Sequence, residues 1–205
     1  MNRLLTALAA LTLLVFLGRA LPAEEDSGLN NDGFITTWLL LAPIPLEKDQ
    51  SGADAVGKEQ LKDEAKLQPK ADEKVKAGGK ELIWKKYQCK EAFFDFNDFL
   101  GKVTEDSVGY AVCYIHAAEE MKDVRLKTGS DDQARIYLNG KEVFKHDEDR
   151  PLEVDEDTTE VTIKKGTNVL VFKVVNEKED WTGCARFMDK DGNVIRNLKV
   201  TAGPK

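Results

Sequence analysis

Segments of alternating apolar and polar residues, separated by tight turns, fill the chain from residue 123 to residue 200. The alternation is clear in Asp123–Thr128 and in Ala134–Leu138. Asn139-Gly140 follows directly and predicts a two-residue hairpin turn, because a type I′ turn needs positive φ at both central residues. The chain returns through Glu142–Phe144, so we predict a β-hairpin here.

A second pair of predicted strands consists of Glu160–Ile163 and Asn168–Val175, joined by a turn at Lys165-Gly166. Nearly every side chain after Asn168 is branched aliphatic or aromatic, which is typical of a strand buried on both faces. Short strands with a turn after each one predict an all-β, antiparallel β-sandwich.

The first half of the chain contains one apolar block and a charged arm. Phe34–Pro45 ends in two prolines, so we predict an edge or leading strand. Residues 47–80 are charged and poor in large apolar side chains, but good helix formers fill roughly Gly57–Leu67 and Pro69 follows them. We therefore expect an arm at 47–80 whose single short helix, at about 57–67, lies over the sandwich.

Further strands are predicted on either side of these segments. Gly78-Gly79 should turn into a strand at Glu81–Trp84, and Phe93–Leu100 should form one short strand with a turn at Asn97-Asp98. We also predict strands over Tyr110–Ile115, over Trp181–Met188 and, after a turn at Asp191-Gly192, over Val194–Val200.

The N-terminus has the pattern of a secretory signal peptide. Arg3 precedes an apolar run from Leu4 to Leu17, and small residues lead to cleavage after Ala20 or, alternatively, Ala23. The run is too short to span a bilayer. A lipid anchor is not expected, because no cysteine lies near the cleavage point. We expect a secreted or periplasmic protein with no membrane span in the mature chain. Its single domain at 34–200 should have flexible segments at 21–33 and 201–205.

Charge and cysteine content narrow the function. The formal net charge of −7 argues against a nucleic-acid partner. The three cysteines, Cys89, Cys113 and Cys184, would leave one free thiol even if two were paired. Cys113 shares a strand face with apolar neighbours, which favours a buried free thiol, and the absence of a C-x-x-C pair disfavours structural zinc.

Several of these segments together resemble galactose-binding-like jelly-roll domains. The resemblance lies in Gly129–Asp132 with the hairpin after it, and in Lys165–Val174 with Trp181. The block with Trp38 and Pro43, and the Trp84–Leu100 region, are similar to exported planctomycete-type bacterial versions. The resemblance covers most of residues 34–200. It implies a sandwich of jelly-roll type and a carbohydrate-binding role, like that of accessory modules in family 2 glycoside hydrolases.

The adjacent Asp131 and Asp132 are also similar to a pair in the anthrax protective-antigen-type sugar-binding domain, where adjacent aspartates hold calcium. The resemblance implies calcium as a cofactor at Asp131 and Asp132, although Gln133 stands where that pattern has glycine. Calcium takes six to eight oxygen ligands, which the acidic runs 147–149 and 155–157 would have to complete. The alternative is a turn stabilised by aspartate side chains.

Three more residues are candidates for contacting a ligand. Trp181 lies next to a polar loop and would offer a flat face to a sugar if exposed, or would close the core if buried. Tyr114 shares a strand face with Tyr110 and His116, which would form either a binding wall or part of the core. Arg150 would clamp a hydroxyl or carboxylate, or form a surface salt bridge.

No catalytic motif is recognisable. His116 and His146 are the only histidines, and there is no H-E-x-x-H, G-x-S-x-G or phosphate-binding loop. We predict an exported, non-catalytic module that binds carbohydrate. The alternatives are a structural or protein-interaction module of an exported complex without a sugar ligand, and a hydrolase whose carboxylates the sequence does not mark.

Overall fold

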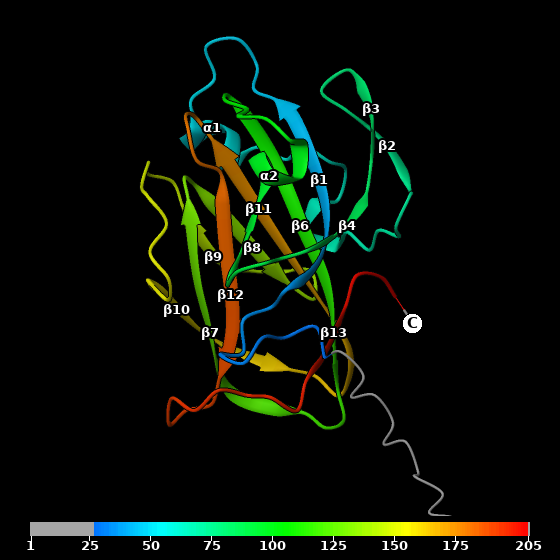
Figure 1. The fold of residues 1–205 in the computed structure, drawn as a ribbon, viewed down its shortest axis with the longest axis vertical. Helices are drawn as coiled ribbons and strands as arrows, with labels where there is room; N and C mark the ends of the chain where they lie inside the picture. The colour runs from blue at the N-terminus through cyan, green and yellow to red at the C-terminus, as the bar shows by residue number, and fades with distance from the viewer. Residues whose placement is uncertain (1–26, 205) are drawn as a thin grey trace, which may run out of the picture.

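The computed structural model describes residues 27–204, so the predicted signal peptide lies outside the described residues. Antiparallel strands dominate these residues and form the predicted β-sandwich (Figure 1). One sheet has seven strands, in the order β4 (Lys85–Gln88), β1 (Thr37–Pro45), β6 (Ser107–Ala117), β11 (Gly166–Asn176), β8 (Ala134–Leu138) and β9 (Lys141–His146), with β13 (Lys199–Thr201) also paired to β6. The other has four strands, in the order β10 (Asp157–Ile163), β7 (Met121–Asp131), β12 (Thr182–Met188) and β5 (Phe93–Asp95).

The main hydrophobic core lies between the two sheets. Strand β6 contributes Ala111, Cys113 and Ile115 to it, in the alternation that a pleated strand requires. Strand β11 lies between β6 and β8, and its inner residues Leu170 and Phe172 are fully buried. All three cysteines are buried free thiols, as predicted for Cys113, and burial raises the pKa of Cys89 to about 12.

A second core covers the opposite face of the seven-stranded sheet. The arm that follows β1 consists of α1 (Gly52–Gly57), a 3₁₀ turn at Glu64–Lys66, and a separate hairpin of β2 (Lys74–Ala77) and β3 (Lys80–Ile83). Its side chains Val56, Leu61 and Trp84 are buried against Tyr110 and Tyr114 of β6. The charged arm is therefore a third layer that lies over the sandwich, as predicted.

The helices do not lie where the sequence predicted them. The segment 58–63 is not helical. Helix α1 lies before it, from Gly52 to Gly57, and begins where the Ser51 side chain accepts a hydrogen bond from the Asp54 amide. A second helix, α2 (Phe96–Leu100), replaces the predicted turn at Asn97-Asp98. It is capped by Asp95 and ends at Gly101, which has a positive φ of 68°.

Strand β1 is the first strand, as predicted, but it is not an edge strand, because it pairs with both β4 and β6. Pairing with β4 stops at Leu40, before the prolines, and the register against β6 shifts between Leu41 and Ile44. Pro43 falls within that shift, where its missing N–H interrupts no regular ladder.

The two ends of the domain also differ from the sequence prediction. Of the predicted strand over 194–200, only a bridge at Val194 and strand β13 form. The domain begins before residue 34, because the Val200 amide donates to the Ser27 carbonyl at 2.7 Å and Leu29 bridges to Ile35. No helix among the described residues is long and apolar enough to cross a membrane.

A buried carboxylate joins the arm to the large sheet. Glu64, which is 3% exposed, accepts hydrogen bonds from the hydroxyls of Tyr110 and Tyr137 and from the Lys173 ammonium at 3.3 Å. The Lys173 amine also donates to the carbonyls of Val56 and Lys58. Burial lowers the pKa of Lys173 to about 8, while Glu64 opposes that shift.

We expect Glu64→Ala to lower the free energy of unfolding by about 3–5 kcal/mol, because it leaves the Lys173 ammonium buried without its counter-charge. Glu47→Ala is the matched control, since Glu47 pairs with Lys58 on the surface of the same arm and should contribute under about 1 kcal/mol. Urea unfolding at pH 7 measures both. Equal losses in the two variants would show that Glu64 does not hold the arm.

The predicted Asn139-Gly140 turn is confirmed, with φ of 54° and 82° at the two residues that join β8 to β9. Gly140→Val should destabilise the protein by about 1–3 kcal/mol, because a β-branched residue resists positive φ. Gly57→Val is the control, since Gly57 lacks a positive φ and a Cβ added there would meet no heavy atom within 4 Å. Thermal unfolding of both variants checks the turn, and an unchanged melting temperature for Gly140→Val would refute it.

Candidate functional site

Trp181 does not form an exposed binding platform. The side chain is fully buried immediately before β12, and its ring centroid lies 4.5 Å from that of Phe96. Its indole N–H donates to the Val174 carbonyl at 3.4 Å. Of the two alternatives for Trp181, burial in the core is confirmed and the exposed platform is excluded, because Phe96 of α2 packs against its ring.

Tyr114 is buried as well, so of the two alternatives for its strand face the structure confirms the core and excludes the binding wall. Its hydroxyl donates to the Pro69 carbonyl at 2.8 Å, and the arm covers Tyr110 beside it. His116, further along the same strand, lies between the hydroxyls of Thr167 and Thr201. The aromatic face that sequence reasoning offered to a ligand is occupied by the chain's own arm.

The other three candidates come together where the chain crosses between the sheets. Asp131 ends β7 in the small sheet, and β8 in the large sheet starts three residues later. Asp131 and Asp132 are 9% and 4% exposed. The Asp132 carboxylate accepts the Glu177 amide N–H at 2.9 Å, while the Ser130 hydroxyl donates to the Asp132 carbonyl. We call this segment, Ser130–Gln133, the crossover.

Arg150 connects a surface loop to the crossover through hydrogen bonds and ion pairs. Its guanidinium donates to the Ser130 hydroxyl at 2.9 Å and to the Asp157 carboxylate at 2.6 Å. A third partner is Glu156, at 3.0 Å. Arg150 thus forms a partly buried ion pair rather than an open clamp, and it orients the loop that carries Asp149 towards Asp132.

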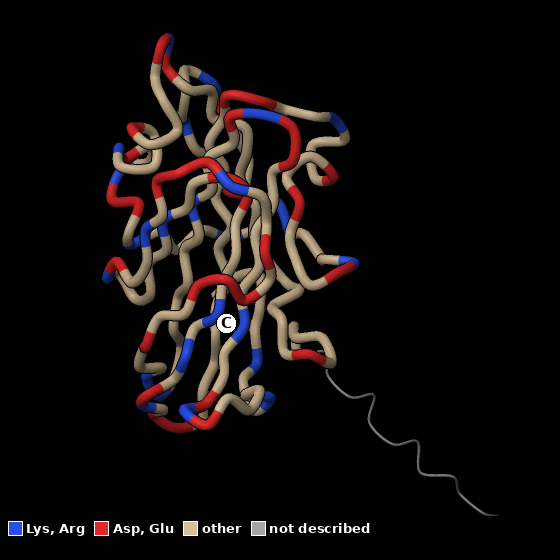
Figure 2. The backbone as a smooth tube through the Cα atoms, turned by 90° about the vertical axis from the view of Figure 1, so that its left-hand side faces the viewer, with Lys and Arg blue, Asp and Glu red and all other residues tan. Residues whose placement is uncertain are grey.

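The crossover brings several acidic side chains together. Burial, and to a smaller extent the hydrogen-bonded Asp149 carboxyl, raise the pKa of Asp132 to about 8. Burial likewise raises the pKa of Asp131 to about 6, with smaller contributions from Asp180 and Asp149. Sequence analysis named Asp149 only as part of the acidic run 147–149 and did not single out Asp180, because only the fold brings their loops to the crossover. Acidic residues elsewhere also gather in loops and turns (Figure 2).

The crossover does not present a complete calcium shell. Within residues 27–204 no three His, Cys, Asp or Glu side chains are arranged to hold a metal ion. Of the acidic runs expected to supply further ligands, Asp149 reaches the crossover, but Asp155 pairs with Arg186, Asp157 with Arg150 and Asp147 with Lys145. The residues present therefore do not fit calcium as they stand, and the calcium prediction gains no support from the geometry.

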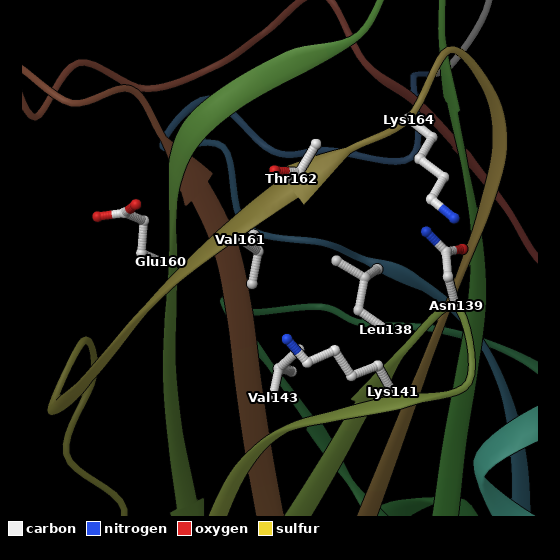
Figure 3. Close-up of a pocket in the computed structure, with 8 residues that line it drawn as sticks. All are labelled: Leu138, Asn139, Lys141, Val143, Glu160, Val161, Thr162 and Lys164. Atoms are coloured by element: carbon white, nitrogen blue, oxygen red, sulfur yellow. The ribbon is translucent and has the colours of Figure 1, made fainter.

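A separate groove lies between the edges of the two sheets and encloses about 290 Å³ (Figure 3). It is bounded by the β8–β9 hairpin and by β10, and sequence analysis gave no sign of it. Its lining residues are Leu138, Asn139, Lys141, Val143, Glu160, Val161, Thr162 and Lys164. The three strands that line it follow one another in the chain, but β10 belongs to the other sheet, so the space depends on how the two sheets pack.

Stability should depend on pH through Asp132. Since its folded pKa is raised from 3.8 to about 8, the folded state keeps a proton that the unfolded chain loses. The resulting stabilisation is complete below about pH 4 and is lost as the pH rises towards 8. Asp132→Asn mimics the protonated form, so its melting temperature should exceed the parent's at pH 8.5 and match it near pH 4.

The control for this measurement is Asp147→Asn in the neighbouring loop. Asp147 is exposed to solvent, and its bond to Lys145 lowers its pKa. That substitution should not raise the melting temperature at pH 8.5. If Asp132→Asn has the parent's melting temperature at every pH, the ionised Asp132 carboxylate does not destabilise the folded state.

Comparison with known proteins assigns no family to the chain. No protein-family model matches it, and no curated protein matches it either. The resemblance to galactose-binding-like domains therefore stays a hypothesis. The structure shows the antiparallel sandwich and the acidic residues at its crossover.

Proposed function

We propose that the protein is an exported, non-catalytic module that binds carbohydrate at the crossover. The observation that carries this proposal is the convergence of Asp131, Asp132 and Asp149 beside Arg150, in which two separate segments of the chain become adjacent in the fold. Carboxyl groups accept hydrogen bonds from sugar hydroxyls, and Arg150 holds the loop of Asp149 beside them.

Burial and mutual repulsion make these carboxyls suited to recruiting hydrogen-bond donors. A carboxyl with a raised pKa is short of groups that stabilise its charge, and clusters of such groups are more frequent at functional sites than elsewhere. Sugar hydroxyls would provide the missing donors. Asp149 is exposed, so a ligand can approach the crossover from the side of its loop.

Recognition at this site would rely on hydrogen bonds rather than on aromatic stacking. All three tryptophans are buried, and no aromatic side chain among residues 27–204 is among the exposed large hydrophobic residues. The ligand-binding role proposed for Trp181 and Tyr114 therefore passes to Asp131, Asp132, Asp149 and Arg150. Contacts of this kind favour a ligand with several free hydroxyls over an apolar one.

Binding of the purified protein to a glycan array, once with calcium and once with EDTA, tests the proposal. We expect neutral glycans to bind, and Asp131→Asn combined with Asp132→Asn to weaken that binding at least about tenfold, since each charged hydrogen bond contributes roughly 1.5–3 kcal/mol. Asp147→Asn should bind as the parent does. A calcium requirement would show that the ion completes the shell on binding.

Two results would refute the proposal. One is an array on which no glycan binds in either buffer. The other is binding that persists unchanged in the Asp131→Asn, Asp132→Asn variant, which would exclude the crossover as the contact site. Thermal unfolding of the variant in parallel separates lost binding from lost folding.

A further inference from the structure

The groove between the two sheet edges has an apolar floor. Leu138 and Val161 are at most 7% exposed, and the partly buried Val143 of β9 lines the same space. These three aliphatic side chains come from β8, β10 and β9, so the floor exists only when both sheets are in place. Because β9 and β10 are the edge strands of their sheets, the space above the floor opens to solvent.

Two lysines face this floor without an ionic partner. Figure 3 shows the amines of Lys141 and Lys164 pointing into the space between the β8–β9 hairpin and β10. Neither amine has a hydrogen bond or ion pair with any residue of the described chain, residues 27–204. The nearest acidic lining residue, Glu160, points away on the far side of β10.

The rim also carries neutral polar groups. Asn139 is already engaged, since its amide donates to the Asn168 side chain at 2.8 Å and its oxygen accepts the Val169 amide. Thr162 adds a hydroxyl to the lining. The groove therefore combines an aliphatic surface, two uncompensated positive charges and few other polar groups, in a protein whose net charge is −7.

We propose that this groove binds a uronic acid residue of an acidic polysaccharide. The C–H face of a pyranose ring would lie on the aliphatic floor, and the sugar carboxylate would take the two ammonium groups as partners. The volume of about 290 Å³ is enough for one sugar residue, and the groove opens to solvent where the rest of the polysaccharide would continue. The choice of a sugar rests on the proposed function, whereas the negative charge of the ligand follows from the groove alone.

The groove and the crossover would select opposite ligands. With a pKa of about 6, Asp131 is largely ionised at neutral pH and repels an acidic sugar, whereas Lys141 and Lys164 attract a carboxylate. A polysaccharide that contains both kinds of residue would satisfy both sites. The two sites can therefore be tested separately with single sugars.

Titration of the ¹⁵N-labelled protein with sodium D-glucuronate, and separately with D-glucose, tests the groove. We expect glucuronate to shift the amide resonances of Lys141, Val161 and Thr162, and glucose to leave them unchanged. Lys141→Gln combined with Lys164→Gln should weaken glucuronate binding at least about tenfold. Lys165→Gln is the matched control, because Lys165 is the next residue in the same turn, lies outside the lining, and should bind as the parent does.

Salt gives an independent readout of the charge interaction. Raising sodium chloride from about 0.05 to 0.5 M should weaken glucuronate binding several-fold, since exposed charges are screened at that ionic strength. The inference is overturned if glucuronate causes no shifts in the groove, if glucose causes equal shifts, or if the double lysine variant binds as the parent does.

Failure of the groove and failure of the crossover can be told apart. Asp131→Asn with Asp132→Asn should abolish neutral glycan binding and leave the glucuronate shifts at Lys141 and Val161 in place. Loss of the glucuronate shifts in that variant, while the double lysine variant retains them, would assign the acidic sugar to the crossover and overturn the inference.

Discussion

The burial of one carboxylate, Glu64, determines what the large sheet presents to its surroundings. Two tyrosine hydroxyls and the Lys173 ammonium donate to it, so the polar groups in the middle of an otherwise apolar sheet face are satisfied only when the arm is in place. Removing one partner of such a pair costs far more than the pair itself contributes, since a lone charge would stay buried. The arm and the sheet therefore form one cooperative unit.

This constraint removes the aromatic sheet face from the surfaces that a ligand could reach. Tyr110, Tyr114 and Tyr137 hold the arm, through hydrogen bonds to Glu64 and to the Pro69 carbonyl. The loops at the crossover and the groove between the edge strands stay accessible. Both are places where the two sheets meet, so their geometry depends on how the layers pack rather than on any one strand.

The sandwich was predictable from the sequence because its signals were local. The Asn139-Gly140 turn and the doubly buried strand β11 follow from neighbouring residues alone, and both are confirmed. The predicted position of the helix was wrong. The charged run after Gly57 contains good helix formers, but in the structure its Glu64 carboxylate accepts hydrogen bonds from donors more than forty residues away. Tertiary hydrogen bonding outweighed the intrinsic preference of that segment.

The candidate site was predictable in part for the same reason. Asp131, Asp132 and Arg150 stood out by type, but their proximity to Asp149 and Asp180 depends on a loop and a strand end that no spacing rule connects. For Trp181 the sequence left exposure and burial open, because a polar neighbouring loop does not reveal that α2 packs against the ring. The sequence did not mark the groove lysines, and they become candidates only because the packing of the two sheets leaves them beside an aliphatic floor without an ion pair.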